Sequence, residues 1–198
     1  MAEQEKYEAV VIGTSAGGLG VLSYLFERLP VNYFLPVIAV QHRYRDQKDL
    51  LEDVLQHKCQ IKIKQADEKE KIKNGVVYIA PPDYHLLIED DHTFSLSADK
   101  HIKFSRPSID VLFESASQVY QKRLVGIILT GASSDGAEGL LTIKKNGGLT
   151  IAQDPLEAQF AYMPLAAIIV ESVEKVWNLK QISSFLLELH NLNEINGK

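Results

Sequence analysis

The chain has 198 residues, of which 45% are hydrophobic and 24% are charged, a composition typical of folded globular proteins and unlike that of disordered ones. This length predicts a single domain over residues 1–198 with one sizeable hydrophobic core. The formal net charge of −5 argues against DNA or RNA as a partner, because nucleic-acid-binding domains usually carry a basic face.

Cysteine usage and apolar run lengths bear on the cellular compartment. The lone Cys59 cannot form an internal disulfide, which favours a reducing compartment. Residues 1–6 lack the apolar stretch of a signal peptide, and no run approaches the roughly 18 apolar residues of a membrane span. The sequence therefore predicts a cytoplasmic protein without membrane insertion.

In the first half of the chain, short β-rich runs alternate with amphipathic segments, the pattern of repeated βα units. Strands are predicted at 7–12, 35–40, 60–64 and 76–80. A helix is predicted between Ser15 and Pro30 and another over 46–58. Their inward positions are predicted to be Leu19, Leu22, Leu25, Phe26 and Leu29 in the first helix, and Leu50, Leu51, Val54 and Leu55 in the second.

The second half begins with short alternating runs from Tyr84 to Phe104, which predict an antiparallel hairpin at the edge of the sheet. The remaining strands are predicted at 124–129, 149–152 and 174–177, and the helices at 107–121, 135–145, 164–170 and 179–192. The apolar face of the first of these helices comprises Val111, Leu112, Ala116 and Val119. The pattern predicts an α/β fold with a mostly parallel sheet flanked by helices.

Three of the predicted strands run into loops that carry Ser15, His42 and Asp135. In open α/β sheets the ligand site lies outside the carboxyl ends of the strands, so residues far apart in sequence can converge there. A nucleophile, a base and an orienting carboxylate are the groups that acyl transfer needs. The sequence therefore offers a candidate catalytic triad.

The first loop, Gly13-Thr14-Ser15-Ala16-Gly17, matches the G-x-S-x-G pattern of a nucleophile elbow. A glycine-rich turn needed only for packing is the alternative interpretation of this short motif. A dinucleotide-binding loop is disfavoured, because G-x-G-x-x-G beginning at Gly13 would need glycine where Ser15 stands. We therefore expect no bound cofactor.

His42 and Asp135 each have a structural alternative as well. A histidine beside a strand end is often only a hydrogen-bonded structural residue, and Asp135 stands where the N-cap of the following helix would lie. The small residues 131–134 can offer backbone N–H groups to an oxyanion. Ser133 and Ser134 are rival nucleophiles, ranked below Ser15 because neither lies in a tight glycine-flanked turn.

Two other groups of charged or metal-ligating residues carry less weight. A metal site is not expected, because no HExxH motif or cysteine pair accompanies His85, His92, His101, Asp90 and Asp91. A docking face for acidic helices is one interpretation of the lysines at 58, 62, 64, 69, 71 and 73. The interspersed Asp67, Glu68 and Glu70 favour an ordinary solvated surface instead.

Over about residues 7–190 the chain resembles the catalytic domain of the CheB-type chemotaxis protein-glutamate methylesterases. The resemblance implies a doubly wound, Rossmann-like three-layer fold, with Ser15 as nucleophile, His42 as base and Asp135 as the third member of the triad. The matching segments are Val11-Ile12-Gly13-Thr14-Ser15-Ala16-Gly17-Gly18, Gln41-His42, Tyr78-Ile79-Ala80-Pro81, Arg106-Pro107-Ser108-Ile109-Asp110-Val111-Leu112-Phe113, Leu129-Thr130-Gly131, Asp135-Gly136-Ala137, Ala152-Gln153 and Met163-Pro164.

The same resemblance implies hydrolysis of glutamyl γ-methyl esters without a cofactor, and it allows deamidation of glutamine by the same steps. The implied partners are the methylated cytoplasmic helices of chemoreceptor-like proteins. In the expected mechanism the backbone N–H groups of Ala132 and Ala16 hold the oxyanion. The alternative is a domain of the same fold that binds a receptor or a signalling partner without turnover, although the intact triad argues against it.

The chain departs from the family pattern at two places. Family members usually carry an N-terminal receiver domain, whereas about six residues precede the first predicted strand here. We therefore expect no control by phosphorylation in cis, and a regulatory partner in trans. The rim of the site also differs, because Arg43-Tyr44 replaces the usual Met-Pro and Ala132-Ser133-Ser134 replaces Met-Gly-Asn.

Overall fold

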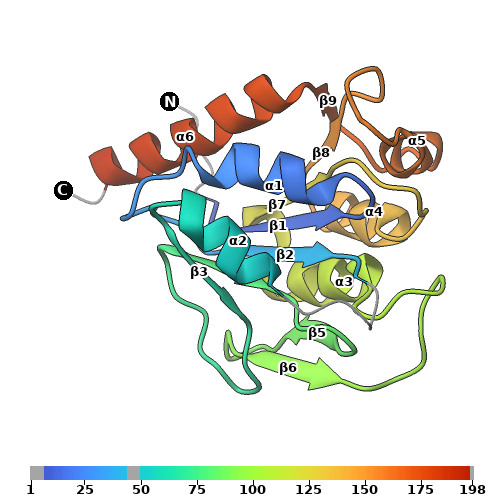
Figure 1. Ribbon diagram of the computed structural model, residues 1–198, viewed down its shortest axis with the longest axis horizontal. Coiled ribbons are helices and arrows are strands. Elements are labelled where there is room, and N and C mark those ends of the chain that lie inside the picture. The colour runs from blue at the N-terminus through green and yellow to red at the C-terminus, as the bar shows by residue number, and fades with distance from the viewer. Residues whose placement is uncertain (1–6, 44–49, 197–198) are drawn as a thin grey trace.

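A seven-stranded parallel sheet forms the centre of the computed structural model, which describes residues 7–43 and 50–196 (Figure 1). The strand order is β3-β4-β2-β1-β7-β8-β9, so β1 lies between β2 and β7. The strands are β1 (Ala9–Thr14), β2 (Val37–Gln41), β3 (Lys62–Gln65), β4 (Val76–Ile79), β7 (Leu124–Ile128), β8 (Leu149–Gln153) and β9 (Lys175–Trp177).

The order of the strands confirms the doubly wound topology. From β1 the chain builds the sheet outward through β2 and then returns to the other side of β1 with β7. All residues of β1, β2 and β7 are buried, as expected of parallel strands covered on both faces. Alternate side chains face opposite layers, so Val10 and Ile12 join one core and Ala9 and Val11 the other.

Helices cover both faces of the sheet, which confirms the three-layer arrangement (Figure 1). Residues of α1 (Gly18–Phe26), α2 (Leu51–Lys58) and α6 (Leu179–Asn196) pack into one core. Residues of α3 (Ile109–Tyr120), α4 (Ala137–Lys145) and α5 (Tyr162–Ile169) pack into the other, and a 3-10 turn, η1 (Gln121–Arg123), follows α3. Within residues 7–43 and 50–196, no helix has the length and apolar character needed to cross a membrane.

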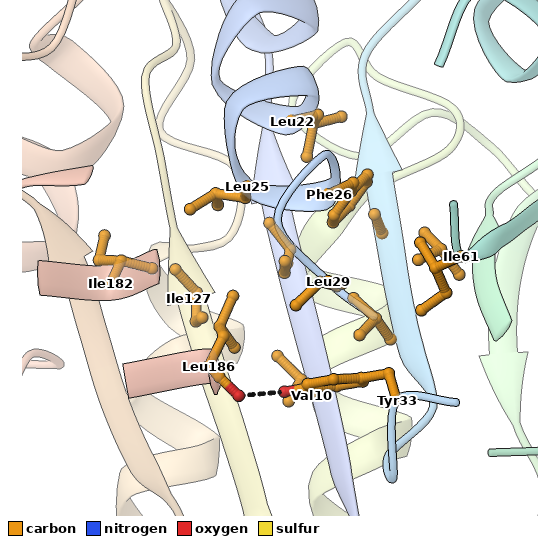
Figure 2. Packing of buried hydrophobic residues seen from close by; sticks show 14 of the residues in the cluster. Val10, Leu22, Leu25, Phe26, Leu29, Tyr33, Ile61, Ile127, Ile182 and Leu186 are labelled. Atoms are coloured by element: carbon orange, nitrogen blue, oxygen red, sulfur yellow. Dashed lines mark hydrogen bonds between the residues drawn. The ribbon is translucent and has the colours of Figure 1, made fainter. Parts of the chain in front are cut away.

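The core on the α1 and α6 face is built from closely packed aliphatic and aromatic side chains (Figure 2). Phe26 of α1 is fully buried, and Ile182 and Leu186 of α6 pack into the same cluster. The phenol of Tyr33, in the connection between α1 and β2, is also buried and donates a hydrogen bond to the Leu186 carbonyl oxygen at 2.9 Å. Burial raises the pKa of this phenol well above its usual range, so it remains a neutral donor.

Three positions that the sequence placed inward are exposed in the structure. Leu19, in the first turn of α1, is 45% exposed, whereas Leu22 and Leu25 further along the helix are fully buried. Leu50 is 53% and Val54 is 42% exposed, whereas Leu55 is fully buried. In the short α2, only the line of Leu51 and Leu55, one turn apart, faces the sheet.

Helix α3 begins at Ile109, two residues after the Pro107 start that the sequence predicted. Its fully buried apolar face also differs from the prediction, because Val111 and Val119 are only partly buried. The buried face contains Ile109, Leu112, Phe113, Ala116 and Tyr120, which recur at helical spacing.

The antiparallel hairpin is confirmed, but it lies at a different place from the one predicted. Strands β5 (His85–Ile88) and β6 (Phe94–Ser97) pair with each other as a separate two-stranded sheet, and the edges of the main sheet are β3 and β9. The hairpin packs against α3, where the Ile88 N–H donates to the Ser115 hydroxyl at 3.1 Å. Its apolar side chains join the core between α3 and the sheet, where Phe94 contacts Tyr78 of β4.

We expect Tyr33→Phe to lower the free energy of unfolding by about 1 kcal/mol, because the buried Leu186 carbonyl loses its phenol donor. Urea unfolding of the variant and the parent protein measures this difference. Tyr24→Phe is the matched control, since it removes a phenol but keeps the ring under the Arg28 guanidinium, 3.7 Å from the ring centroid. Equal stability of Tyr33→Phe and the parent would show that the phenol does not anchor α6.

Candidate active site

Ser15, His42 and Asp135 lie at the same edge of the sheet, as the sequence predicted. They follow β1, β2 and β7, the three adjacent strands at its centre. The Ser15 N–H donates to the Thr130 carbonyl oxygen at 3.0 Å, and the His42 N–H donates to the Thr14 carbonyl oxygen at 3.1 Å. These bonds extend the ladder past the strand ends, and the strand alternation directs the side chains of Ser15 and His42 toward the α3 layer.

The imidazole of His42 is hydrogen-bonded through both of its ring nitrogens. Nε2 lies 2.8 Å from the Oδ2 atom of Asp135, and the two side chains are 11% and 0% exposed. Nδ1 lies 3.3 Å from the hydroxyl of Ser105, a residue in the segment between β6 and α3. The pair of His42 and Asp135 therefore has the geometry of the base and orienting carboxylate of a hydrolytic triad.

The Asp135 carboxylate accepts four hydrogen bonds, two at each oxygen. Oδ1 accepts from the Ser108 hydroxyl at 2.8 Å and from the Asp110 N–H at 3.2 Å. Oδ2 accepts from the Ile109 N–H at 2.7 Å, in addition to His42. Since the two N–H groups belong to the first turn of α3, the carboxylate also lies at the positive end of that helix.

The ionisation of Asp135 follows from these contacts. Burial alone would raise the pKa of its carboxyl, but the hydrogen bond and charge of His42, with the donors of Ile109 and Ser108, hold the pKa below its ordinary value. Asp135 is therefore a carboxylate at neutral pH. An ionised acceptor fixes the His42 proton on Nε2 and leaves Nδ1 as the acceptor nitrogen of the neutral ring.

The alternative role for Asp135, capping the helix that follows it, belongs to a different residue. The Oδ1 atom of Asp110 accepts from the N–H groups of Gly136 and Gly139, at 2.9 and 2.8 Å, and so caps α4. Asp135, at the start of α4, caps α3 instead. The two aspartates thus cap each other's helices, and Asp135 combines a helix cap with contact to His42.

Asp110 is the electrostatic counterpart of Asp135. Burial and the neighbouring charge of Asp135 raise the pKa of the Asp110 carboxyl, and they outweigh the opposing contacts with Lys103 and Gly139. The ammonium of Lys103 lies 2.8 Å from Asp110 Oδ2. The site therefore contains two adjacent carboxyls whose environments shift their pKa values in opposite directions.

The Ser15 turn is held by the backbone and by Gln41. Gly17 has a φ of 80°, in the left-handed region, and the Gly18 N–H donates to the Ser15 carbonyl oxygen at 2.9 Å. The Gln41 amide donates to the same oxygen at 2.7 Å. Because a Cβ on Gly18 would collide with the Gln41 side chain, the turn needs a glycine at this position.

The backbone donors expected to hold an oxyanion lie in the loops after β1 and β7, two adjacent strands of the sheet. Among the described residues, the N–H groups of Ala16 and Ala132 have no hydrogen-bond acceptor. The Thr130 hydroxyl donates to the Ala16 carbonyl oxygen at 3.1 Å, which connects the two loops. Both N–H groups are therefore available to a negatively charged oxygen.

Arg43 and Tyr44 are the other residues predicted at the rim of the site. The Arg43 guanidinium pairs with Glu52 at 2.7 Å and donates to the Ala80 carbonyl oxygen at 3.0 Å, so it is largely occupied within the protein. Tyr44 lies outside the described residues. Of the rival nucleophiles, Ser133 accepts a hydrogen bond from the Asp135 N–H at 3.1 Å. Among the hydrogen bonds of the described residues, none joins the hydroxyl of Ser15, Ser133 or Ser134 to His42, whose Nδ1 faces Ser105.

Two of the remaining histidines and the lysine-rich segment have local structural contacts. His85 is buried between the Lys100 carbonyl oxygen and the Ser108 N–H, and the ring of His92 packs on Tyr120. In the part of the chain that the structure describes, no three His, Cys, Asp or Glu side chains are grouped to hold a metal ion. Lys64 pairs with Asp67 and Glu70 at 2.7 Å each, as expected of a solvated surface with mixed charges.

Sequence reasoning assigned no role to Ser105, Ser108 or Asp110, although all three surround the His42 and Asp135 pair. The segment Ser108-Ile109-Asp110 carried a signal, because serine and aspartate at a helix start are typical capping residues. The spacing of these residues could not show which helix each would cap, because Asp110 caps a helix whose start at Gly136 is 26 residues away.

Comparison with known proteins connects this geometry to a family. The family described as CheB methylesterase matches residues 10–186. A Leptospira interrogans protein is 51% identical over 94% of this chain and 97% of its own length, and it is provisionally named a protein-glutamate methylesterase/protein-glutamine glutaminase. A Clostridium acetobutylicum protein with that name, unqualified, is 32% identical over 93% of this chain.

The chain spans 54% of the Clostridium acetobutylicum protein, so it corresponds to about half of that longer relative. Among solved structures, the CheB methylesterase catalytic domain of Thermotoga maritima is similar, with a TM-score of 0.88 and 32% sequence identity. The match covers 93% of this chain and 99% of that domain. The fold and its doubly wound topology are therefore those of the family's catalytic domain.

We expect Asp135→Asn to lower the free energy of unfolding by about 2–3 kcal/mol at pH 7. Each carboxylate oxygen accepts two hydrogen bonds, so an amide nitrogen in place of either oxygen would face two donors and no acceptor. Chemical denaturation measures the loss, and Asp99→Asn, on the exposed loop after β6, is the matched control. Equal stability of Asp135→Asn and the parent would contradict the capping role.

The same carboxylate predicts the pH dependence of stability. The pKa of Asp135 in the folded protein lies below its ordinary value of 3.8. The carboxylate therefore makes its full contribution to the free energy of unfolding above about pH 3.8, and this contribution is lost as the pH falls through the lowered pKa. The stability difference between the parent and Asp135→Asn should therefore shrink on acidification. A difference that stays constant down to strongly acidic pH would show that the charge is not its source.

Proposed function

The chain belongs to the CheB methylesterase family and is a protein-glutamate methylesterase, and we propose that Ser15, His42 and Asp135 are its catalytic residues. The observation that carries the assignment is the buried pair of His42 and Asp135, 2.8 Å apart, at the strand end next to the Ser15 turn. The proposed reaction is hydrolysis of a glutamyl γ-methyl ester within a protein, by way of an acyl-enzyme.

In the first half of the reaction, the Ser15 oxygen attacks the ester carbonyl carbon while its proton passes to Nδ1 of His42. Nε2 stays hydrogen-bonded to Asp135, which stabilises the imidazolium that forms. The N–H groups of Ala16 and Ala132 hold the oxygen of the tetrahedral intermediate, a contact typically worth about 10²-fold to 10³-fold in rate per donor. The imidazolium then protonates the leaving oxygen, and methanol departs.

In the second half, Nδ1 accepts a proton from a water molecule as that water attacks the acyl-enzyme. The bond to Ser15 breaks, the serine recovers its proton, and the glutamate carboxylic acid is released and ionises. An amide leaving group can follow the same route, with ammonia in place of methanol. This second activity agrees with the name protein-glutamine glutaminase that the relatives carry.

The proposed substrates are methylated cytoplasmic helices of chemoreceptor-like proteins, and the proposed compartment is the cytoplasm. The family membership supports the receptor class. The unpaired, buried Cys59 supports a reducing compartment.

We expect Ser15→Ala to reduce methanol release from a methylated receptor fragment by about 10⁴-fold or more while the melting temperature stays the same. Ser15 is a half-buried loop residue outside both hydrophobic clusters, so its hydroxyl contributes little to the core. Ser134→Ala, which removes a rival nucleophile from the neighbouring loop, should retain most of the turnover. Release at the parental rate by Ser15→Ala would refute the assignment of the nucleophile.

His42→Gln should lose turnover to a similar degree, because the serine hydroxyl is a weak nucleophile without a base. The double variant Ser15→Ala, His42→Gln should be barely slower than either single variant, since members of a triad act as a unit. Single-turnover methanol release by the three variants tests this. Additive losses would mean that Ser15 and His42 act independently, whereas a parent that binds the fragment but releases no methanol would favour a non-catalytic binding domain.

A further inference from the structure

A tight backbone turn at residues 102–105 lies against the His42 ring. The Ile102 N–H donates to the Ser105 carbonyl oxygen at 3.1 Å, and the Ser105 N–H donates to the Ile102 carbonyl oxygen at 2.8 Å. The two residues between them, Lys103 and Phe104, have φ values of 47° and 67°. Residues other than glycine rarely adopt this left-handed backbone conformation, and where they do the surrounding structure holds them in it.

Two basic side chains fasten the segment that contains this turn. The Lys103 ammonium pairs with Asp110 at 2.8 Å and donates to the Ser134 carbonyl oxygen at 3.3 Å, so it ties the turn to both helix caps beside Asp135. At the base of the segment, the Arg106 guanidinium donates to the carbonyl oxygens of residues 98 and 99. The side chain of Phe104 is 99% exposed, so packing of this ring does not hold the turn.

The fastened turn places the Ser105 hydroxyl 3.3 Å from Nδ1 of His42. Because the Nε2–H group donates a hydrogen bond to the ionised Asp135, Nδ1 is the acceptor nitrogen of the neutral ring. The Ser105 hydroxyl is therefore the donor in this contact. The ring is held from both sides, by a carboxylate at one nitrogen and by a hydroxyl at the other.

We propose that Ser105 is a positioning residue for the catalytic base: its hydroxyl holds His42 in the orientation and tautomer that accept the proton of Ser15. This proposal rests on the proposed function, because it assigns a role within the same triad. A second hydrogen bond limits rotation of the ring, which the bond to Asp135 alone does not prevent. It also favours the tautomer whose proton lies on Nε2.

The distance between the Ser105 hydroxyl and Nδ1 of His42 indicates whether Ser105 only positions the ring or permanently blocks Nδ1. Nδ1 has one lone pair, so Ser105 and Ser15 cannot both donate to it fully. Hydrogen bonds from hydroxyl groups usually measure about 2.7–2.8 Å, and the 3.3 Å contact is correspondingly weak. The Ser105 hydroxyl therefore yields Nδ1 when the Ser15 hydroxyl approaches with bound substrate.

The first test is steady-state methanol release from a methylated receptor fragment by Ser105→Ala. We expect kcat to fall about threefold to tenfold, the range that one neutral hydrogen bond corresponds to, while KM is unchanged. Ser105→Thr, which keeps the hydroxyl, should restore most of kcat. Ser97→Ala is the matched control, because that hydroxyl, at the end of β6, accepts a hydrogen bond from the Asp99 N–H and makes none with His42 or Asp135 among the described residues.

The second test needs no substrate, so it remains informative if the proposed function fails. Nitrogen-15 NMR of the imidazole rings in the full chain reports which ring nitrogen carries the proton. We expect His42 in the parent to be mainly the Nε2–H tautomer, and Ser105→Ala to increase the Nδ1–H population, whereas Ser97→Ala leaves the signals unchanged. His42→Gln assigns the signals by removing them.

Two results would overturn the proposal. The first is identical kcat and identical His42 nitrogen signals in Ser105→Ala and the parent, which would make the contact incidental. The second is acylation of Ser105 in Ser15→Ala by an activated ester such as p-nitrophenyl acetate, detected by mass spectrometry of its peptide. That result would make Ser105 a nucleophile in its own right.

Discussion

The buried carboxylate of Asp135 is the interaction on which the rest of the site depends. It has no exposed surface, and its two oxygens accept four hydrogen bonds from two parts of the chain, His42 and the start of α3 at residues 108–110. A buried charge is tolerated only when it is paired and fully hydrogen-bonded, so the positions of its donors are constrained together. One group thereby fixes the start of α3, the loop after β7 and the orientation of His42. Catalytic geometry and local stability consequently have the same physical origin.

The reciprocal capping of α3 and α4 extends this constraint to the surrounding layer. Asp110 caps α4 as Asp135 caps α3, so the two helix starts are held side by side. Close approach of the helices needs a small residue, because a Cβ on Gly139 would lie 2.7 Å from the Cβ of Phe113. The proximity of two carboxyls is offset by Lys103, whose ammonium binds the one with the raised pKa. The same lysine belongs to the turn that places a hydroxyl on the imidazole, so the helix caps and the base share one electrostatic network.

The winding of the sheet explains how distant residues meet at this network. Because β1 lies between β2 and β7, the loops after these strands are neighbours at one edge, although His42 and Asp135 are 93 residues apart. Ligand sites in doubly wound sheets lie at the edge where the strand order reverses direction. The match to the Thermotoga maritima catalytic domain, at a TM-score of 0.88, shows that the family retains this architecture at 32% identity. Topology provides the convergence, and the loop residues provide the chemistry.

The sequence alone determined the properties that depend on local spacing. Buried β-rich runs predicted the strands and helical periodicity predicted most helices. Ser15, His42 and Asp135, each after a predicted strand, together made a candidate triad, whereas the motif around Ser15 was by itself also compatible with a packing turn. Tertiary structure decided which neighbours each residue meets. Local rules assigned Asp135 to the helix that follows it, whereas packing gave that cap to Asp110 and turned Asp135 toward α3 and His42. Packing likewise left Val54 exposed and brought Ser105 to the imidazole. Periodicity records which face of an element is apolar, but contacts between segments far apart in the chain leave no trace in it, so only the folded arrangement of strands and helices specifies them.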